Sequence, residues 1–320
     1  MLQPLVHRTK VSQKYSNESL HYHRAGLLGA AINLGQDKGG VSLAPDSLRK
    51  NHITQQLLDH GFRVEDFGNV TNRSGRGDTV GDVFFALYEE CLAMAADKDF
   101  SLVVGGDHSI ALSSVAAQLK KYPDLSVLWV DAHGDINTPS TSPTGNLHGM
   151  PVALLLGLIE SGELPGFEWH PGGLRPEKIA YIGVRDLDAG EKKIISDLGI
   201  ALYTAEEVND RGMSRVLSDA MMKIDPEGIS PLHLSFDIDG VDPELAPATG
   251  LRVPGGLNKQ HVHELGEFVA QTGRLVSADF VELNPEEAAN NEELLESVGI
   301  LLDLLDTMLG QDTVVYHSYA

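Results

Sequence analysis

Short apolar runs alternate with helical stretches along nearly the whole sequence, and this alternation constrains the fold more than any other feature. The clearest runs are 25–32, 102–104, 125–130, 179–184, 232–236 and 275–280. Most are apolar at every position, as in strands that are covered by helices on both faces. Strands separated by helices usually pair in parallel. The pattern predicts an α/β fold with a doubly wound, mostly parallel sheet and helices on both faces, in three layers.

Helical periodicity fits the segments between these runs. Helices are predicted at 80–96, 110–121, 151–158, 190–198 and 213–224, with a further one beginning near Pro45. The last strong helix starts near Glu292, and its apolar residues recur every three or four positions up to Leu305, before a capping Gly310. The sequence shows no linker and no internal repeat, so residues 25–320 are predicted to form a single domain.

Charge and cysteine content narrow the classes of partner. The chain has 46 acidic and 24 basic residues and a net charge of -22. This balance argues against nucleic acid as a partner and fits either a cationic ligand or simple solubility. Cys91 is the only cysteine, which excludes an internal disulfide and a thiolate metal cluster. No run of about 18 uncharged apolar residues occurs, so no membrane span is expected.

Residues 1–24 form a basic N-terminal extension. This segment carries Arg8, Lys10, Lys14 and Arg24 against one acidic residue, Glu18. Such a contrast with the acidic remainder is compatible with a mitochondrial transit peptide. It fits equally well a basic arm that is not a targeting signal. The expected location is therefore either mitochondrial or cytoplasmic.

Potential metal ligands directly follow the predicted strand 125–130. Asp131, His133 and Asp135 stand at a spacing of two, so an extended backbone would point all three side chains to one side. A lone Asp or His at a strand end is usually a cap or a hydrogen-bond partner. Three buried polar side chains on one side each need a partner, and a metal ion would serve all of them.

A second acidic group follows the predicted strand 232–236. Asp237 and Asp239 share a side, and their like charges would repel strongly unless a cation lay between them. Asp242 precedes a proline and is interpreted as a turn residue. His108 lies in a glycine turn between a strand and a helix, which by itself is weak support for a metal site.

Together these segments offer two imidazoles and four carboxylates as ligands, namely His108, His133, Asp131, Asp135, Asp237 and Asp239. Hard oxygen donors with a minority of nitrogen suit Mn²⁺ better than Zn²⁺. Four carboxylates would also balance the charge of two divalent cations. Two such ions a few Å apart can lower the pKa of a shared water toward neutrality and direct it at an electrophilic carbon. The predicted reaction is therefore a hydrolysis.

Four longer motifs resemble the arginase branch of the ureohydrolase family. They are GGDHS at 105–109, DAHGDINTP at 131–139, GNLHGMP at 145–151 and SFDIDGVDP at 235–243. The resemblance covers about residues 25–309. It implies an arginase-like fold and a binuclear manganese hydrolase that cleaves the guanidino group of L-arginine to L-ornithine and urea. The alternative within this class is an agmatinase or another guanidino-acid ureohydrolase, and the alternative outside it is a non-catalytic pseudoenzyme.

The resemblance also implies how two Mn²⁺ ions per subunit would share the ligands. One ion would be held by His108, Asp131, Asp135 and Asp237. The other would be held by His133, Asp131, Asp237 and Asp239. Asp131 and Asp237 would then bridge the two ions, and Asp135 would also accept a hydrogen bond from the shared hydroxide.

The same resemblance assigns residues to proton transfer and substrate binding. His148 would carry a proton near the mouth of the site, although a histidine in a glycine-rich loop can also be purely structural. Glu282 would pair with the substrate guanidinium through two parallel hydrogen bonds; the alternative is an exposed charge after a strand. The amino-acid end of the substrate would be held by Asn137, Thr144, Asn146, Asp186 and Asp188. These residues favour arginine over agmatine, which has no carboxylate.

Four positions depart from the family pattern. At one of them Thr144 stands where Ser is usual, which keeps the hydroxyl. Leu251 stands where a Thr beside the guanidinium is usual, and loss of a buried hydroxyl there would cost about 1 kcal/mol of transition-state binding. Gln260 and His261 replace an Arg-Glu pair used in subunit contacts. The family tends to form trimers or hexamers, so a homotrimer or homohexamer is expected.

Overall fold

A computed structural model describes residues 24–74, 77, 79–160, 162–170 and 172–310. Residues 1–23 of the predicted N-terminal extension lie outside the described part, and its last residue, Arg24, is the first residue of strand β1. The strands are β1 (Arg24–Ala31), β2 (Arg63–Thr71), β3 (Phe100–Gly105), β4 (Ser126–Val130), β5 (Ile179–Val184), β6 (Ala201–Thr204), β7 (Leu232–Asp237) and β8 (Leu275–Val281).

The strands form one eight-stranded sheet in the order β2-β1-β3-β8-β7-β4-β5-β6. Every neighbouring pair is parallel. The predicted mostly parallel sheet is thus confirmed, and its described strands are in fact parallel throughout. Strands β3, β8, β7 and β4 are consecutive neighbours, so the loops that follow their carboxyl ends meet at one edge of the sheet.

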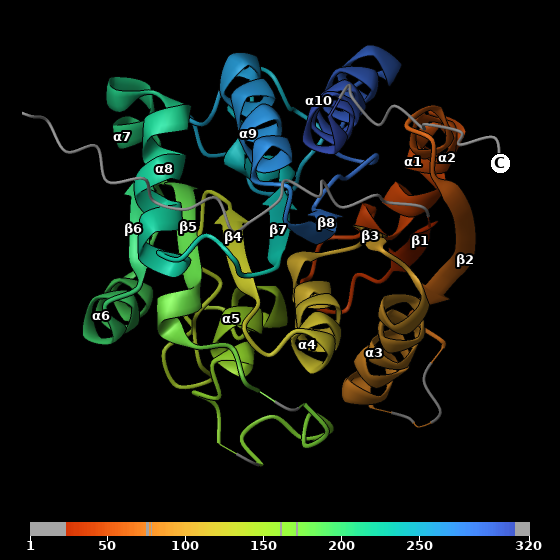
Figure 1. The fold of residues 1–320 in the computed structure, drawn as a ribbon. Coiled ribbons are helices and arrows are strands. Elements are labelled where there is room, and N and C mark those ends of the chain that lie inside the picture. The colour runs from red at the N-terminus through yellow and green to blue at the C-terminus, as the bar shows by residue number, and fades with distance from the viewer. Residues whose placement is uncertain (1–23, 75–76, 78, 161, 171, 311–320) are drawn as a thin grey trace, which may run out of the picture.

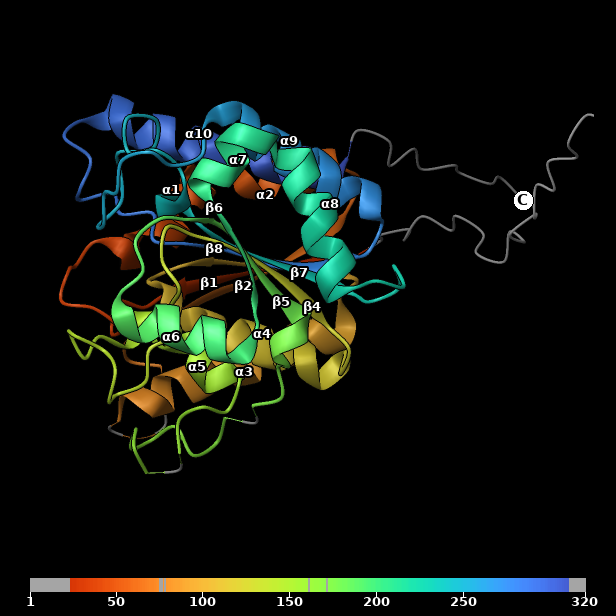
Figure 2. The ribbon, with the colours of Figure 1, turned by 90° about the vertical axis from the view of Figure 1, so that its left-hand side faces the viewer.

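Helices cover both faces of the sheet. They are α1 (Ala44–Lys50), α2 (Ile53–Asp59), α3 (Val80–Asp97), α4 (Ala111–Lys121), α5 (Pro151–Leu155), α6 (Ala189–Leu198), α7 (Ala205–Arg211), α8 (Met213–Ile224), α9 (Lys259–Thr272) and α10 (Asn291–Leu309). The 3₁₀ helices are η1 (Val41–Leu43), η2 (His108–Ile110), η3 (Leu147–Gly149), η4 (Pro176–Lys178) and η5 (Ile238–Gly240). Figure 1 shows α7–α10 and α1–α2 on one side of the sheet and α3–α6 on the other. The edge-on view in Figure 2 confirms the predicted three layers.

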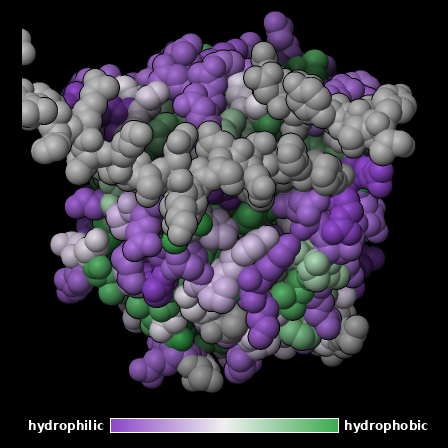
Figure 3. Space-filling model, viewed as in Figure 1, coloured by the Kyte–Doolittle hydropathy of each residue, from purple (hydrophilic) through white to green (hydrophobic). Residues whose placement is uncertain are grey.

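Each face of the sheet has its own apolar core. On the face toward α8, α9 and α10, Phe236 and Phe280 of neighbouring strands pack edge to face at 6.2 Å. On the other face, Trp129 and Tyr181 pack at 6.5 Å. These side chains are at most 1% exposed, as expected for strands covered on both sides. The outer surface in the view of Figure 3 is mostly hydrophilic, with small separate apolar areas.

Capping residues define both ends of α10, the helix that the sequence predicted to begin near Glu292. Asn290 begins α10 by accepting hydrogen bonds from the backbone N–H groups of Glu292 and Glu293. Gly310 ends the same helix with a φ of 75°, a conformation that favours glycine. No helix in the described part of the chain combines the length and apolar character needed to cross a bilayer.

The structure contains two strands and three α-helices that the sequence analysis did not predict, namely β2, β6, α2, α7 and α9. The predicted helix 151–158 is also shorter, since α5 ends at Leu155. Strand β2 is an edge strand whose residues are mostly exposed, so it lacks the continuous apolar run of the other strands. Strand β6 at the opposite edge has only four residues.

Candidate metal centre and substrate site

The first site segment follows β3. Backbone packing requires glycine here, because a Cβ on Gly106 would lie 2.0 Å from the carbonyl oxygen of Ile32. The carboxylate of Asp107 then accepts hydrogen bonds from the backbone N–H of Gly35, at 2.8 Å, and of Ser109, at 3.1 Å. This arrangement begins η2 at His108 and places the imidazole at the carboxyl edge of the sheet.

The second segment follows β4 and does not have the extended conformation that its spacing suggested. The strand ends at Val130, and Asp135 has a φ of 50°, in the left-handed region that non-glycine residues rarely adopt. The expectation of three side chains aligned by an extended backbone is therefore wrong. Instead, Asp131 accepts a hydrogen bond from the backbone N–H of His133 at 2.7 Å. The chain bends here, so that Asp131 and Asp135 face His108, whereas His133 faces Asp239.

The third segment follows β7. Asp237 accepts a hydrogen bond from the backbone N–H of Asp239 at 2.8 Å, which begins η5 and holds both carboxylates at the sheet edge. Asp242 instead accepts from the backbone N–H groups of Glu244 and Gly255, at 3.0 and 2.7 Å. Its interpretation as a turn residue is confirmed.

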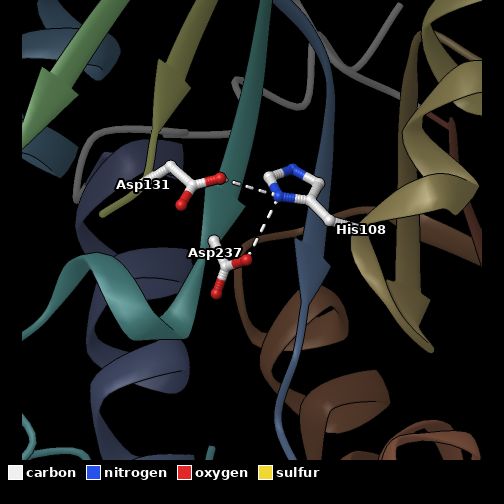
Figure 4. A group of neighbouring side chains, drawn as sticks. All are labelled: His108, Asp131 and Asp237. Atoms are coloured by element: carbon white, nitrogen blue, oxygen red, sulfur yellow. Dashed lines mark ion pairs between the residues drawn. The ribbon is translucent and has the colours of Figure 1, made fainter. Parts of the chain in front are cut away.

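His108 lies at the centre of one group of potential ligands. Its Nδ1 atom is 2.9 Å from Oδ2 of Asp131, 3.0 Å from Oδ2 of Asp135 and 3.1 Å from Oδ2 of Asp237. Figure 4 shows Asp131 and Asp237 pointing at this nitrogen from two neighbouring strand ends. Nδ1 is buried and, within the described part of the chain, makes no hydrogen bond of acceptable geometry. A buried nitrogen facing three carboxylates in this way fits a metal ligand.

A second group centres on His133. Its Nδ1 atom lies 3.1 Å from Oδ2 of Asp239 and 3.4 Å from Oδ1 of Asp131. Asp131 thus belongs to both groups, through its two different oxygens. The donor sets of both groups are rich in oxygen, which fits divalent Mn²⁺. All six ligands proposed from the sequence are therefore brought together at this edge.

Crowded carboxylates shift the pKa values of the site. Burial, and then repulsion from Asp239 and Asp131, raise the pKa of Asp237 well above its usual value. Burial and repulsion from Asp131 raise the pKa of Asp135 to about 6. Burial opposes protonation of His108, but its carboxylate neighbours outweigh it and raise the pKa of that imidazole. A bound cation would supply the positive charge that protons supply here.

Trp129 supports the first group from below, which sequence reasoning missed. Its ring stacks on the His108 imidazole with centroids 4.1 Å apart and planes 10° apart. Its indole Nε1–H also donates to Oδ2 of Asp131 at 3.0 Å. The sequence indication of this role was that Trp129 stands two residues before Asp131, the spacing at which side chains of a strand lie on the same face.

Glu282 and His148 lie together beside the first group. Oε1 of Glu282 accepts from the backbone N–H of His108 at 3.0 Å, and Nδ1 of His148 lies 3.1 Å from the same oxygen. Oε2 accepts from Nε2 of Gln36 at 2.7 Å. Glu282 has a φ of 61°, so its backbone is strained in a way that recurs at functional sites. Gln36 was not among the site residues expected from the sequence.

These contacts also set the charge state of the pair. Burial opposes protonation of His148, but the hydrogen bond and the charge of Glu282 raise its pKa to about 9. Burial likewise opposes ionisation of Glu282, but the bonds from His148, the backbone of His108 and Gln36 hold its pKa below the usual value. In the metal-free protein the two side chains therefore form an ion pair at neutral pH.

The residues expected to bind the amino-acid end of the substrate lie in two places. Asn137 donates from Nδ2 to Oδ2 of Asp188 at 2.8 Å, and the other Asp188 oxygen caps α6 by accepting from the backbone N–H of Glu191. Asp186 is exposed, and its Oδ2 lies 3.8 Å from Nε2 of His133, the ring nitrogen that faces away from Asp239. Asp186 thus lies on the side of the His133 imidazole opposite Asp239, at the distance of an ion pair and not of a hydrogen bond.

Thr144 and Asn146 lie in the loop before η3. The hydroxyl of Thr144 accepts from the backbone N–H of Asn146 at 3.1 Å, and Thr144 is exposed. Asn146 and Gln36 line a shallow hollow of about 280 Å³. This hollow connects the loop that carries Asn146 to Gln36, which donates a hydrogen bond to Glu282.

The departures from the family pattern lie on the surface. The side chain of Leu251 is 41% exposed. Next to it, the carbonyl oxygen of Gly250 accepts from Nζ of Lys38 at 2.6 Å. His261 forms a capping box with Asn258 at the start of α9. A hollow of about 550 Å³ lies between α9 and α10 and is lined by none of the expected site residues.

The protein has a parallel sheet covered by helices, and the carboxyl edge of this sheet gathers two overlapping Asp/His groups beside a buried glutamate. Such a site in an α/β fold fits the class of metal-dependent hydrolases. Residues 23–305 match the arginase family. Arginase of Saccharomyces cerevisiae is 42% identical over 328 aligned positions, which cover 93% of this chain and 96% of the yeast protein. The chain belongs to the arginase family.

Solved structures agree with this assignment. Arginase from Bacillus subtilis superposes with a TM-score of 0.82 at 34% identity, over 91% of this chain and all of that one (100%). Arginase from Entamoeba histolytica, solved in complex with L-ornithine, gives a TM-score of 0.79 at 30% identity, over 90% and 99% of the two chains. The arginase-like α/β fold expected from the sequence is therefore confirmed.

Proposed function

We propose that this protein is a binuclear manganese arginase that hydrolyses L-arginine to L-ornithine and urea. One observation carries the proposal. The buried Nδ1 of His108 faces three carboxylate oxygens, and one of these carboxylates, Asp131, also belongs to the group around His133. Two cation positions that share a carboxylate are what a binuclear site requires.

The donor set supports Mn²⁺ as the metal. His108, Asp131, Asp135 and Asp237 would hold one ion. His133, Asp131, Asp237 and Asp239 would hold the other. Two Mn²⁺ ions, when bound, would activate water for attack on the guanidino carbon. Because these carboxylates are buried, bulk water would not compete with them for the ions.

Glu282 and His148 fit the remaining steps of guanidino hydrolysis. The buried carboxylate of Glu282 would bind the guanidinium through charge-assisted hydrogen bonds and hold its carbon near the metal ligands. His148 is 3.1 Å from that carboxylate and partly accessible, so it would carry a proton between solvent and the departing amine. Asp135, whose pKa is raised to about 6, lies 3.0 Å from Nδ1 of His108 and would accept a hydrogen bond from the attacking water.

The polar loop and α6 favour an amino-acid substrate. Asn137 and Asp188 are joined by a hydrogen bond, and Asp188 would face an α-ammonium group. Thr144 and Asn146 would offer neutral donors to an α-carboxylate. The ornithine complex of the Entamoeba histolytica relative supports the same substrate class for this chain. Agmatine lacks the carboxylate and would leave these groups unpaired.

Assembly is proposed from the family resemblance, and location is proposed from the basic composition of residues 1–24. We infer a homotrimer or homohexamer, which light scattering on the eluting protein would measure. The location is proposed to be mitochondrial or cytoplasmic, and imaging of the full-length chain against a version lacking residues 1–24 would distinguish the two.

Product analysis tests the proposed function. The protein, loaded with Mn²⁺, is incubated with L-arginine, and ornithine and urea are quantified together. The proposal predicts equal amounts of the two products and loss of both after treatment with a chelator. Citrulline with ammonia, or no product at all from Mn²⁺-loaded protein, would contradict it.

A further inference from the structure

A buried polar network lies beneath His108, between the central strands and α4. His233 and Ser235 of β7 pair in register with Ser277 and Asp279 of β8, so their side chains share one face of the sheet. These four side chains are at most 2% exposed. Burying an ionisable pair costs desolvation free energy that an apolar pair would not. The network is therefore expected to serve something besides stability.

Asp279 accepts hydrogen bonds on both of its oxygens. Ser235 Oγ donates to Oδ1 at 2.6 Å, and Ser114 Oγ of α4 donates to Oδ2 at 2.6 Å. The Nε2 atom of His233 lies 3.0 Å from Oδ2. Burial raises the pKa of Asp279, but His233 outweighs this effect and holds that pKa below its usual value. Asp279 is thus a carboxylate, which can only accept hydrogen bonds.

The ionised state of Asp279 determines the direction of the hydrogen bond between Ser235 and His108. Its hydroxyl has one proton, which is donated to Asp279, so Ser235 Oγ must accept from Nε2 of His108, 2.9 Å away. Nε2 of His108 therefore carries a proton. When the ring is neutral, Nδ1 is then the nitrogen with a free lone pair, and Nδ1 is the atom that faces the carboxylates of the candidate metal centre.

We infer that Asp279, acting through Ser235, is a positioning residue that fixes the tautomer and orientation in which His108 offers Nδ1 to a metal ion. This inference rests on the proposed function, because it concerns a ligand of the proposed Mn²⁺ site. Among the described residues, Ser235 is the one whose hydrogen bonds connect Asp279 to His108. Outer partners of histidine ligands typically change metal affinity by about 10- to 100-fold.

Mn²⁺ titration of four variants tests the inference without any measurement of turnover. The variants are Ser235→Ala, Asp279→Ala, Asp279→Asn and the double variant Ser235→Ala/Asp279→Ala. Bound Mn²⁺ is counted from the loss of the paramagnetic resonance signal of the free ion. Ser126→Ala is the matched control, because Ser126 is an equally buried strand serine whose hydroxyl bonds to the carbonyl oxygen of Ile224 instead. Thermal unfolding of each metal-free protein shows which variants are folded.

Ser235→Ala and Asp279→Ala should each weaken binding of one Mn²⁺ by about 10- to 100-fold, and the control should match the parent. A relay in series predicts that the double variant binds no more weakly than Ser235→Ala alone. Asp279→Asn, whose amide oxygen can still accept from Ser235, should recover part of the affinity. Parent affinity in Ser235→Ala, or losses that multiply in the double variant, would overturn the inference. A parent protein that binds no Mn²⁺ would instead overturn the proposed function itself.

Discussion

The Nδ1 atom of His148 lies 3.1 Å from Oε1 of Glu282, and the contact joins a loop histidine to a glutamate at the end of a central strand. Both residues were expected from the sequence to act in the site, His148 as a proton carrier and Glu282 as the partner of the substrate guanidinium. Their direct contact means that a substrate guanidinium and a protonated His148 would compete for one carboxylate. Release of that imidazole from Glu282 would then accompany substrate binding.

The same contact predicts a pH-dependent contribution to stability in the metal-free protein. The folded pKa of His148 is about 9, above the usual value near 6.5. The stabilisation is therefore fully present below about pH 6.5 and is lost as pH rises through about 9. Between these limits the parent should lose on the order of 3 kcal/mol more unfolding free energy than His148→Gln. Urea unfolding near pH 6 and pH 10 measures this, and parallel losses in both proteins would contradict the ion pair.

Asp237→Asn should abolish urea production and reduce bound Mn²⁺, because Asp237 reaches His108 from β7 and is proposed to bridge the ions. Asp242→Asn is the matched control, since Asp242 lies in the same segment but bonds only to turn backbone. The control should keep its metal, although weakening these charged turn hydrogen bonds should cost about 2 kcal/mol of stability. Elemental analysis checks both. Two tightly held Mn²⁺ in an active Asp237→Asn protein would refute the bridging assignment.

Asp188→Asn distinguishes the two roles of this side chain, which caps α6 and is proposed to face the α-ammonium group of the substrate. Asparagine is also a good helix cap, so α6 should keep its N-terminus and the protein its stability. The lost charge should lower kcat/KM for arginine by about 10- to 100-fold, because a hydrogen bond to a charged group would be weakened. Agmatine, which retains only its guanidinium end, provides the comparison. An unchanged kcat/KM for arginine would place the α-ammonium elsewhere.

Leu251→Thr should raise kcat/KM for arginine and agmatine alike, by about fivefold, since a restored hydroxyl contributes about 1 kcal/mol. The position adjoins Gly250, which bonds to Lys38 near Gln36 and hence near the Glu282 end of the site. The substituted side chain is partly exposed, so little change in stability is expected. An effect confined to arginine would assign Leu251 to the amino-acid end instead.

Much of the fold followed from the sequence because buried parallel strands have a continuous apolar signature. The six predicted strands were the ones covered on both faces, whereas β2 and β6 lie at the edges and lack that signature. Helix α9 could have been found: Val262, Leu265 and Val269 recur at helical spacing after a capping Asn258.

The gathering of the metal ligands was also predictable, because carboxyl ends of neighbouring parallel strands meet at one edge. Local spacing could not give the turn at Asp135 or the placement of Asp186 beside His133, since both depend on tertiary contacts. The pairing of Ser235 with Asp279 likewise needs the register of β7 against β8. Residues that support a ligand from another strand have no signature in the sequence around that ligand.

The most direct test of the account is the kcat/KM of the Mn²⁺-loaded protein for L-arginine, agmatine and 4-guanidinobutyrate, followed by urea release. A site built for an amino-acid end predicts that arginine exceeds both analogues by several kcal/mol of transition-state binding, or about a thousandfold. Loss of the carboxylate in agmatine and of the ammonium in 4-guanidinobutyrate would each leave polar groups unpaired. Equal efficiency toward arginine and agmatine would contradict the arginase assignment and favour an agmatinase, and no urea from any of the three would contradict catalysis by this site.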